Sequence, residues 1–233
     1  TQDGVALLTT ELRTFLDGRF VDVRSSEGLQ LVTYASLFLA RELSRAGKRS
    51  DTRTLLTDVL GRVDACSYAQ TSWEILLRLA RVNLELGHHE DCEKLLRRAR
   101  KDAPSVWALE AELLLAELIV ARQEPWAEDV FARIEANELS PGVQMRLGLL
   151  RAEHHVRQER ADDAERQLGM VVALHREWGA HLSKAMVCLL EGDIARLRGE
   201  LDAARSSWRE ALDRMGADED ELAHRVEIRM GDL

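Results

Sequence analysis

Histidine and cysteine side chains gather at one point of the chain, where His88, His89 and Cys92 fall within five residues and raise the question of a metal site. A zinc site needs three or four converging ligands, and no fourth ligand is evident here. Both histidines fall where we predict a turn between two helices, and Cys92 occupies a position that alanine fills in similar segments. We therefore interpret the group as a solvated turn beside a packing cysteine, with no metal and no other cofactor.

Other patterns that could carry chemistry also have simpler structural explanations. The segment Gly-Lys-Arg-Ser at 47–50 lacks the earlier glycine and the preceding strand that a phosphate-binding loop requires. His154 and His155 are adjacent, so on a helix they point about 100° apart and do not readily share a ligand. We find no nucleophile elbow, zinc-protease helix or dinucleotide-binding fingerprint. The sequence predicts that the chain is not an enzyme.

Composition and charge exclude two further classes. The net charge is −9, and acidic and basic residues alternate along the chain instead of forming the basic patch that nucleic-acid binding needs. The longest apolar stretch, 113–121, is interrupted by Glu117 and is too short to cross a bilayer. The 3 cysteines favour a reducing compartment, so we expect a cytoplasmic protein that contacts neither nucleic acid nor membrane.

These residues are positioned by a pattern that returns five times. The residues expected at its turns are 35 to 40 positions apart: Gly47, Gly87, Arg122, Glu159 and Gly199. Five residues after each turn a small side chain is usual, in the series Thr52, Cys92, Ala127, Ala164, Ala204. Four residues later comes a large apolar one, in the series Leu56, Leu96, Phe131, Leu168, Trp208, and three later Val59, Ala99, Ile134, Val171, Ala211. This spacing places all three positions on one helix face.

The pattern predicts helices throughout, joined by short turns. We expect them near 5–17, 28–46, 50–63, 68–86, 89–102, 105–122, 126–137, 141–159, 162–177, 181–198, 201–215 and 218–231. Small residues upstream of the turns (Ala40, Ala80, Ala152, Gly192) allow close approach of the paired helix. Glycine at three of the turns favours left-handed helix caps, and Asp51, Ser105, Ser140 and Asp218 are predicted N-caps.

At these residues, most clearly from Leu79 to Pro104 and from Gly192 to Ala211, the chain resembles a tetratricopeptide repeat (TPR) array. The resemblance implies an all-α fold, a right-handed α-solenoid of about five helical hairpins over 31–216. A partial repeat or flanking helix and a connector would occupy 1–30, and a capping helix or the start of a further repeat 217–233. The repeat spacing is longer than usual for the family and is similar to that of arrays in bacterial regulators of the MalT and AfsR type.

The resemblance also implies a function, the non-catalytic binding of a protein or peptide in a concave groove lined by the first helix of each hairpin. Carried onto this chain, the groove residues are Leu37, Arg41, Arg45, Leu77, Arg81, Glu112, Leu149, Glu153, Leu189 and Asp193. One row, mostly apolar, would hold the four leucines and Glu112. The next row would run from positive to negative, from Arg41 and Arg81 to Glu153 and Asp193, with Arg45 flanking it at one end. Such a groove suits an amphipathic helix or extended segment whose acidic end faces Arg41 and Arg81.

Two alternatives stay open. Residues 5–17 and 228–233 resemble pieces of further repeats, which indicates a fragment of a longer protein. The chain could then be a ligand-sensing, autoregulatory region of a bacterial signal-transduction ATPase or transcriptional regulator, with neighbouring domains of the parent chain as partners. Separately, the helix 106–121 is apolar nearly all round, so it is either buried on all sides or forms the floor of a groove.

Overall fold

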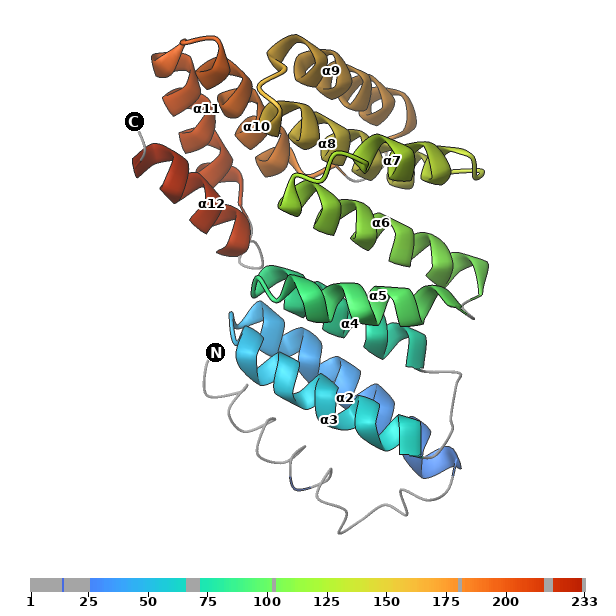
Figure 1. The fold of residues 1–233 in the computed structure, drawn as a ribbon. Helices are drawn as coiled ribbons and strands as arrows, with labels where there is room; N and C mark the ends of the chain where they lie inside the picture. The colour runs from blue at the N-terminus through green and yellow to red at the C-terminus, as the bar shows by residue number, and fades with distance from the viewer. Residues whose placement is uncertain are drawn as a thin grey trace. The chain divides into compact units, whose positions relative to one another are not determined.

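The computed structural model describes residue 14 and residues 26–65, 72–101, 104–179, 182–215 and 220–231. These residues form helices and connecting turns, with no strand among them. The helices are α2 (Ser26–Arg45), α3 (Arg49–Ala65), α4 (Ser72–Glu85), α5 (His89–Lys101), α6 (Ser105–Arg122), α7 (Ala127–Glu135), α8 (Pro141–Arg157), α9 (Ala161–Trp178), α10 (Lys184–Leu197), α11 (Leu201–Arg214) and α12 (Asp220–Gly231) (Figure 1). The all-α prediction is confirmed, and the predicted bounds agree within a few residues. Apart from residue 14, the predicted helix 5–17 lies outside the described residues, as does the predicted cap Asp218.

The chain divides into two compact units, residues 1–114 and 115–233. In the first unit, α2 packs against α3, α3 against α4, and α4 against α5, so the hairpins follow one another in sequence order. In the second unit, α8 pairs with α9 and α10 with α11. There α10 also contacts α8 and α9, while α12 lies against α10 and α11.

The helix–helix turns share one backbone arrangement. The residue that ends each turn has a left-handed φ: 70° at Gly47, 73° at Gly87 and 79° at Gly199, but also 56° at Gln123 and 59° at Glu159. Two backbone bonds close each turn, as when Arg160 N–H donates to the His155 carbonyl at 2.9 Å and Glu159 N–H to the Val156 carbonyl at 3.0 Å. This is the pairing of a Schellman cap.

The turn and cap predictions need two corrections. The left-handed residue of the third turn is Gln123, not Arg122, which still belongs to α6. Neither Asp51 nor Ser105 is an N-cap, because Asp51 lies in the first turn of α3, which begins at Arg49, and Ser105 is the first residue of α6. Ser140 caps α8 as predicted, accepting from Val143 N–H at 3.5 Å, with Pro141 as the first helical residue. Ser183, which the sequence analysis overlooked, caps α10 in the same way.

The repeat positions form the core, as predicted. All fifteen side chains of the small, large and third positions are buried, from Thr52 to Ala211. The closest fit is in the last hairpin, where a Cβ on Gly192 would overlap the indole of Trp208. Helix α6 is buried along 113–116 and 118–120, so its apolar circumference is covered and does not line an open groove.

Candidate partner-binding faces

The predicted apolar row is mostly inside the protein. Leu37, Leu77 and Leu189 are buried, and Leu149 packs against the core cluster that contains Ala152. For Leu189 on α10 the burial has a visible cause, because α10 contacts α8, α9, α11 and α12. The expectation of an exposed leucine row is therefore wrong for Leu37, Leu77 and Leu189, while Leu149 is half-buried.

The predicted basic residues of the first unit are accessible. Arg41 and Arg45 are exposed on α2, and both contact Glu42, with nitrogen–oxygen distances of 3.3 and 3.0 Å. The Arg41 guanidinium also lies over the Phe38 ring, 5.2 Å from its centroid. Arg81 is partly buried on α4. The positive end of the predicted charged row is thus available on α2.

An exposed apolar stripe precedes these arginines on the same helix. Leu31, Tyr34 and Phe38 are 53%, 54% and 47% exposed, and with Arg41 and Arg45 they recur at the three- and four-residue spacing of one helix face. We call these five residues the α2 stripe. One repeat later, the positions equivalent to Tyr34, Phe38 and Arg41 carry Glu74, Arg78 and Arg81. The sequence analysis missed the apolar part of the stripe, although its heptad-like spacing was readable.

The predicted acidic residues are engaged within the protein. Glu112 on α6 contacts Arg100 on α5, with 2.7 Å between Oε1 and Nε. Glu153 on α8 and Asp193 on α10 are only 6% and 1% exposed. The prediction that they face an open groove is wrong, because α12 covers them. Glu153 and Asp193 lie beside arginines of α12 in the second unit. Arg41 and Arg45 belong to the first unit.

Both carboxylates are held by arginines that the sequence analysis did not single out. Arg225 Nη2 is 2.6 Å from Glu153 Oε1, and Arg229 Nε is 2.6 Å from Asp193 Oδ1. Arg157 also contacts Glu153 Oε1, at 2.9 Å. The sequence did contain a sign of these contacts, because Arg225 and Arg229 are four residues apart and therefore lie on the same face of a helix.

The two carboxyl groups have opposite pKa shifts. Burial acts to raise the pKa of Glu153, but Arg225 and Arg157 together outweigh it, and the pKa lies below its usual value. For Asp193 burial dominates over Arg229, so the pKa is raised. The difference follows from the contacts, because Glu153 has two guanidinium partners while the Oδ2 of Asp193 is buried without a hydrogen-bond partner in the described structure.

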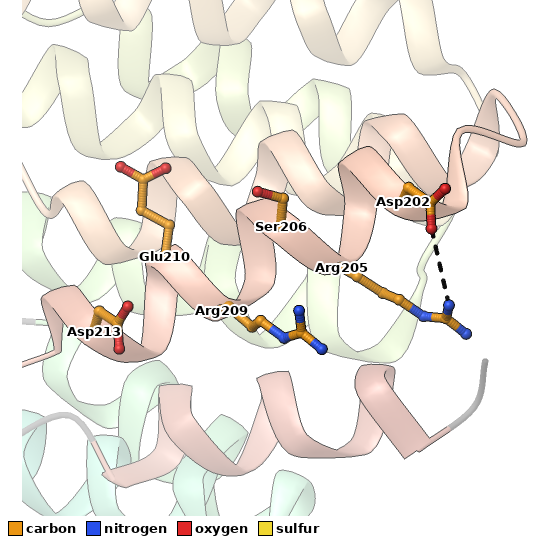
Figure 2. Close-up of a pocket in the computed structure, with 6 residues that line it drawn as sticks. All are labelled: Asp202, Arg205, Ser206, Arg209, Glu210 and Asp213. Carbon is orange, nitrogen blue, oxygen red and sulfur yellow. Dashed lines mark ion pairs between the residues drawn. The ribbon is translucent and has the colours of Figure 1, made fainter.

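Two surface hollows lie in the second unit. One of about 610 Å³ follows the outer face of α11, and Figure 2 shows its lining side chains projecting from that single helix: Asp202, Arg205, Ser206, Arg209, Glu210 and Asp213. A second, of about 250 Å³, lies between α8, α9 and the segment before α8, with Leu147 and Val171 among its apolar residues and Gln144 and Gln167 among its amides.

The histidine and cysteine residues considered as metal ligands do not come together in the described structure. His88 is exposed at its turn while Cys92 is fully buried, so these side chains do not converge. Cys188 is buried, and Cys66 lies outside the described residues. Among the described residues, no three histidine, cysteine or acidic side chains are arranged to hold a metal ion. None of the described helices combines the length and apolar character needed to cross a membrane.

Comparison with known proteins identifies the fold. No family model and no curated protein matches the chain. Among solved structures, it is similar to a thermophilic TPR protein from Thermus thermophilus, with a TM-score of 0.58 and 18% identity over 85% of this chain and 98% of that one. It is also similar to a tetratricopeptide repeat protein from Parabacteroides merdae, with a TM-score of 0.52 and 19% identity over 98% and 99% of the two chains. The chain has the fold of a TPR array, an all-α solenoid of helical hairpins.

Proposed function

We propose that the chain is a non-catalytic scaffold that binds a protein or peptide, and that the α2 stripe is its main contact surface. The observation that carries this proposal is the run of exposed Leu31, Tyr34 and Phe38 that leads into Arg41 and Arg45. Exposed contiguous apolar residues rimmed by charge mark interaction sites, and tyrosine, phenylalanine and arginine are enriched at interface cores. The fold supports the same conclusion, because repeat arrays offer extended surfaces for partners.

The chemistry of the stripe defines its partner. An amphipathic helix or extended segment would place apolar side chains on Leu31, Tyr34 and Phe38 and a carboxylate near Arg41 and Arg45. Arg41 is already stacked on Phe38, so its guanidinium is held in place for a planar, two-point contact with a carboxylate. The partner is thus apolar with an acidic end, as the charged row in the sequence suggested. A sensor role within a larger regulator stays a prediction.

Charge reversal on α2 tests the proposal. Partners captured by the full chain are identified, and their affinity is compared for wild type, for Arg41→Glu with Arg45→Glu, and for Lys94→Glu with Arg97→Glu. The last pair removes the same charge from the outer face of α5, where both residues are exposed. We expect the α2 variant to bind at least about tenfold more weakly, since two charge-assisted contacts are lost, and the α5 variant to bind like wild type. Neither change should alter the melting temperature.

Two outcomes would contradict the proposal. Equal binding by all three proteins would remove the stripe from consideration. The chain itself supplies a rival occupant, because residues 5–17 include Leu8, Leu12 and Phe15 together with Glu11. A gain of binding when Leu12 and Phe15 are both changed to serine would assign the stripe to these residues instead of an external partner.

A further inference from the structure

The face of α8 and α10 that α12 covers has the features of a recognition site. It presents two buried carboxylates, Glu153 and Asp193, that belong to different hairpins. Each is contacted by an arginine of α12, Glu153 by Arg225 and Asp193 by Arg229. Without those two arginines, Glu153 would keep Arg157, whereas Asp193 would lose the guanidinium that neutralises it. The uncovered face would therefore attract a cationic ligand.

Helix α12 shows what kind of ligand fits. Val226 is fully buried in the cluster that contains Leu189 and Trp208, and Leu222 and Met230 pack against the same cluster. These apolar residues lie four apart, and the two arginines, also four apart, flank Val226 along the helix. The face therefore accepts an amphipathic helix that carries arginines one turn apart beside an apolar stripe, which is the helix-in-groove mode of recognition.

The fit between α12 and this face is incomplete. Arg229 contacts Oδ1 of Asp193 through Nε, while its Nη1 donates to the backbone carbonyl of Arg225 at 3.1 Å. Oδ2 of Asp193 is buried and has no hydrogen-bond partner in the part of the chain that the structure describes. A guanidinium that approached the carboxylate in a fork would pair with both oxygens. A helix with that geometry would satisfy an acceptor that α12 leaves unpaired.

We propose that this face of α8 and α10 is a second binding site, specific for an arginine-bearing helix of a partner protein, and that α12 is its internal competitor. The site lies in the second unit and takes a cationic ligand, whereas the α2 stripe lies in the first and takes an acidic one. The two proposals are independent, and failure of one leaves the other unaffected.

A labelled peptide of residues 218–233 serves as the probe. Its binding is followed by fluorescence anisotropy on the full chain, either wild type or with Arg225→Glu and Arg229→Glu, which turns the resident arginines against the two carboxylates. We expect the variant to bind the peptide at least about tenfold more tightly than wild type does, because its own α12 no longer competes. A peptide with both arginines changed to glutamate should not bind.

Matched variants make the result specific. Arg205→Glu with Arg209→Glu applies the same charge change to the exposed face of α11 (Figure 2) and should leave peptide binding as in wild type. Adding Glu153→Gln and Asp193→Asn to the α12 variant should abolish the gained binding. If the charge-reversed chain loses its helical circular dichroism, Arg225→Gln with Arg229→Gln replaces it under the same criteria.

The proposal is overturned if the folded α12 variant fails to bind the peptide, or if binding persists after Glu153 and Asp193 are neutralised. It is also overturned if the wild-type chain proves to be a dimer that exchanges α12 between copies, since a second copy would then be the occupant. Light scattering of the unlabelled chain shows whether it is a dimer, and loss of that dimer in the α12 variant shows whether α12 holds it together.

Discussion

At the scale of single residues, the clearest case is the contact between Trp208 and Gly192. The tryptophan is fully buried, and it fits because Gly192 has no side chain where the indole lies. Its ring nitrogen is buried without a hydrogen-bond partner in the described structure, so the residue contributes through packing and not through polar contacts. Trp208 thus occupies the same buried position as Leu56, Leu96, Phe131 and Leu168 in the other hairpins.

Replacing Trp208 with alanine should lower the free energy of unfolding by about 3–5 kcal/mol, because the cavity cannot be refilled by its small neighbours. Urea denaturation followed by circular dichroism measures the difference. Trp178 provides the control, since its side chain is 60% exposed and its replacement by alanine should change stability little. Two variants with the same midpoint would show that the indole is not a core residue.

At the scale of elements, one of the helix–helix turns is destabilised by a residue other than glycine in a left-handed backbone conformation. Glu159 adopts a left-handed backbone with φ at 59°, a region where a side chain is unfavourable and glycine is not. Glu159→Gly should raise the free energy of unfolding by about 1 kcal/mol, while Gly199→Ala, at φ of 79°, should lower it by a similar amount. Thermal or urea unfolding of the two variants checks both signs. Destabilisation by the glycine would mean that Glu159 makes a contact worth more than the backbone strain.

Helix α8 should make the second unit sensitive to acid. Burial lowers the pKa of both His154 and His155, and nearby Arg160 lowers them further. The Nδ1 atoms of both rings are buried without hydrogen-bond partners in the described structure, and His154 packs edge-on against Phe131 with 5.8 Å between ring centroids. The folded state thus binds these protons less readily than the unfolded chain does.

It follows that stability is complete above the unfolded histidine pKa of about 6.5 and decreases as the pH falls below it. Unfolding by urea at pH 7.5 and pH 5.5 should show a lower midpoint at the acidic pH. Replacing both histidines with glutamine should make the midpoint less dependent on pH over this interval. A wild-type midpoint that stays constant or rises on acidification would contradict the assignment.

The elements also show how far sequence reasoning reached. The small, large and third positions were predictable because they recur in every hairpin. Their contacts lie within one hairpin, so they depend only on short-range spacing in the sequence. The burial of Leu189 was not predictable in this way, because it depends on the helices α8 and α12 that contact α10. The same holds for Glu153 and Asp193, which are covered by arginines as many as 72 positions away. The left-handed residue of the third turn was predicted one position too early, at Arg122 instead of Gln123, because that turn contains no glycine.

At the scale of the whole molecule, a defect in one hairpin should remain local. Each unit of a repeat array is stabilised by its neighbours, and this chain divides into compact units at 1–114 and 115–233. In the Trp208→Ala variant, amide hydrogen exchange should quicken in α10, α11 and α12, while α2 to α5 retain their wild-type protection. Mass spectrometry of peptic peptides resolves these regions. Uniformly faster exchange would show that the chain opens as one cooperative body.

The contact between Gly192 and Trp208 also constrains the order in which these two residues could have arisen during evolution. Equivalent small positions elsewhere hold Ala40, Ala80 and Ala152, opposite leucines. A tryptophan introduced opposite alanine would overlap its methyl group, whereas glycine opposite leucine would leave a small gap. The substitution to glycine at position 192 is therefore expected to have preceded the substitution to tryptophan at position 208. Once both are present, neither can revert alone, so among homologous hairpins the two positions should change together.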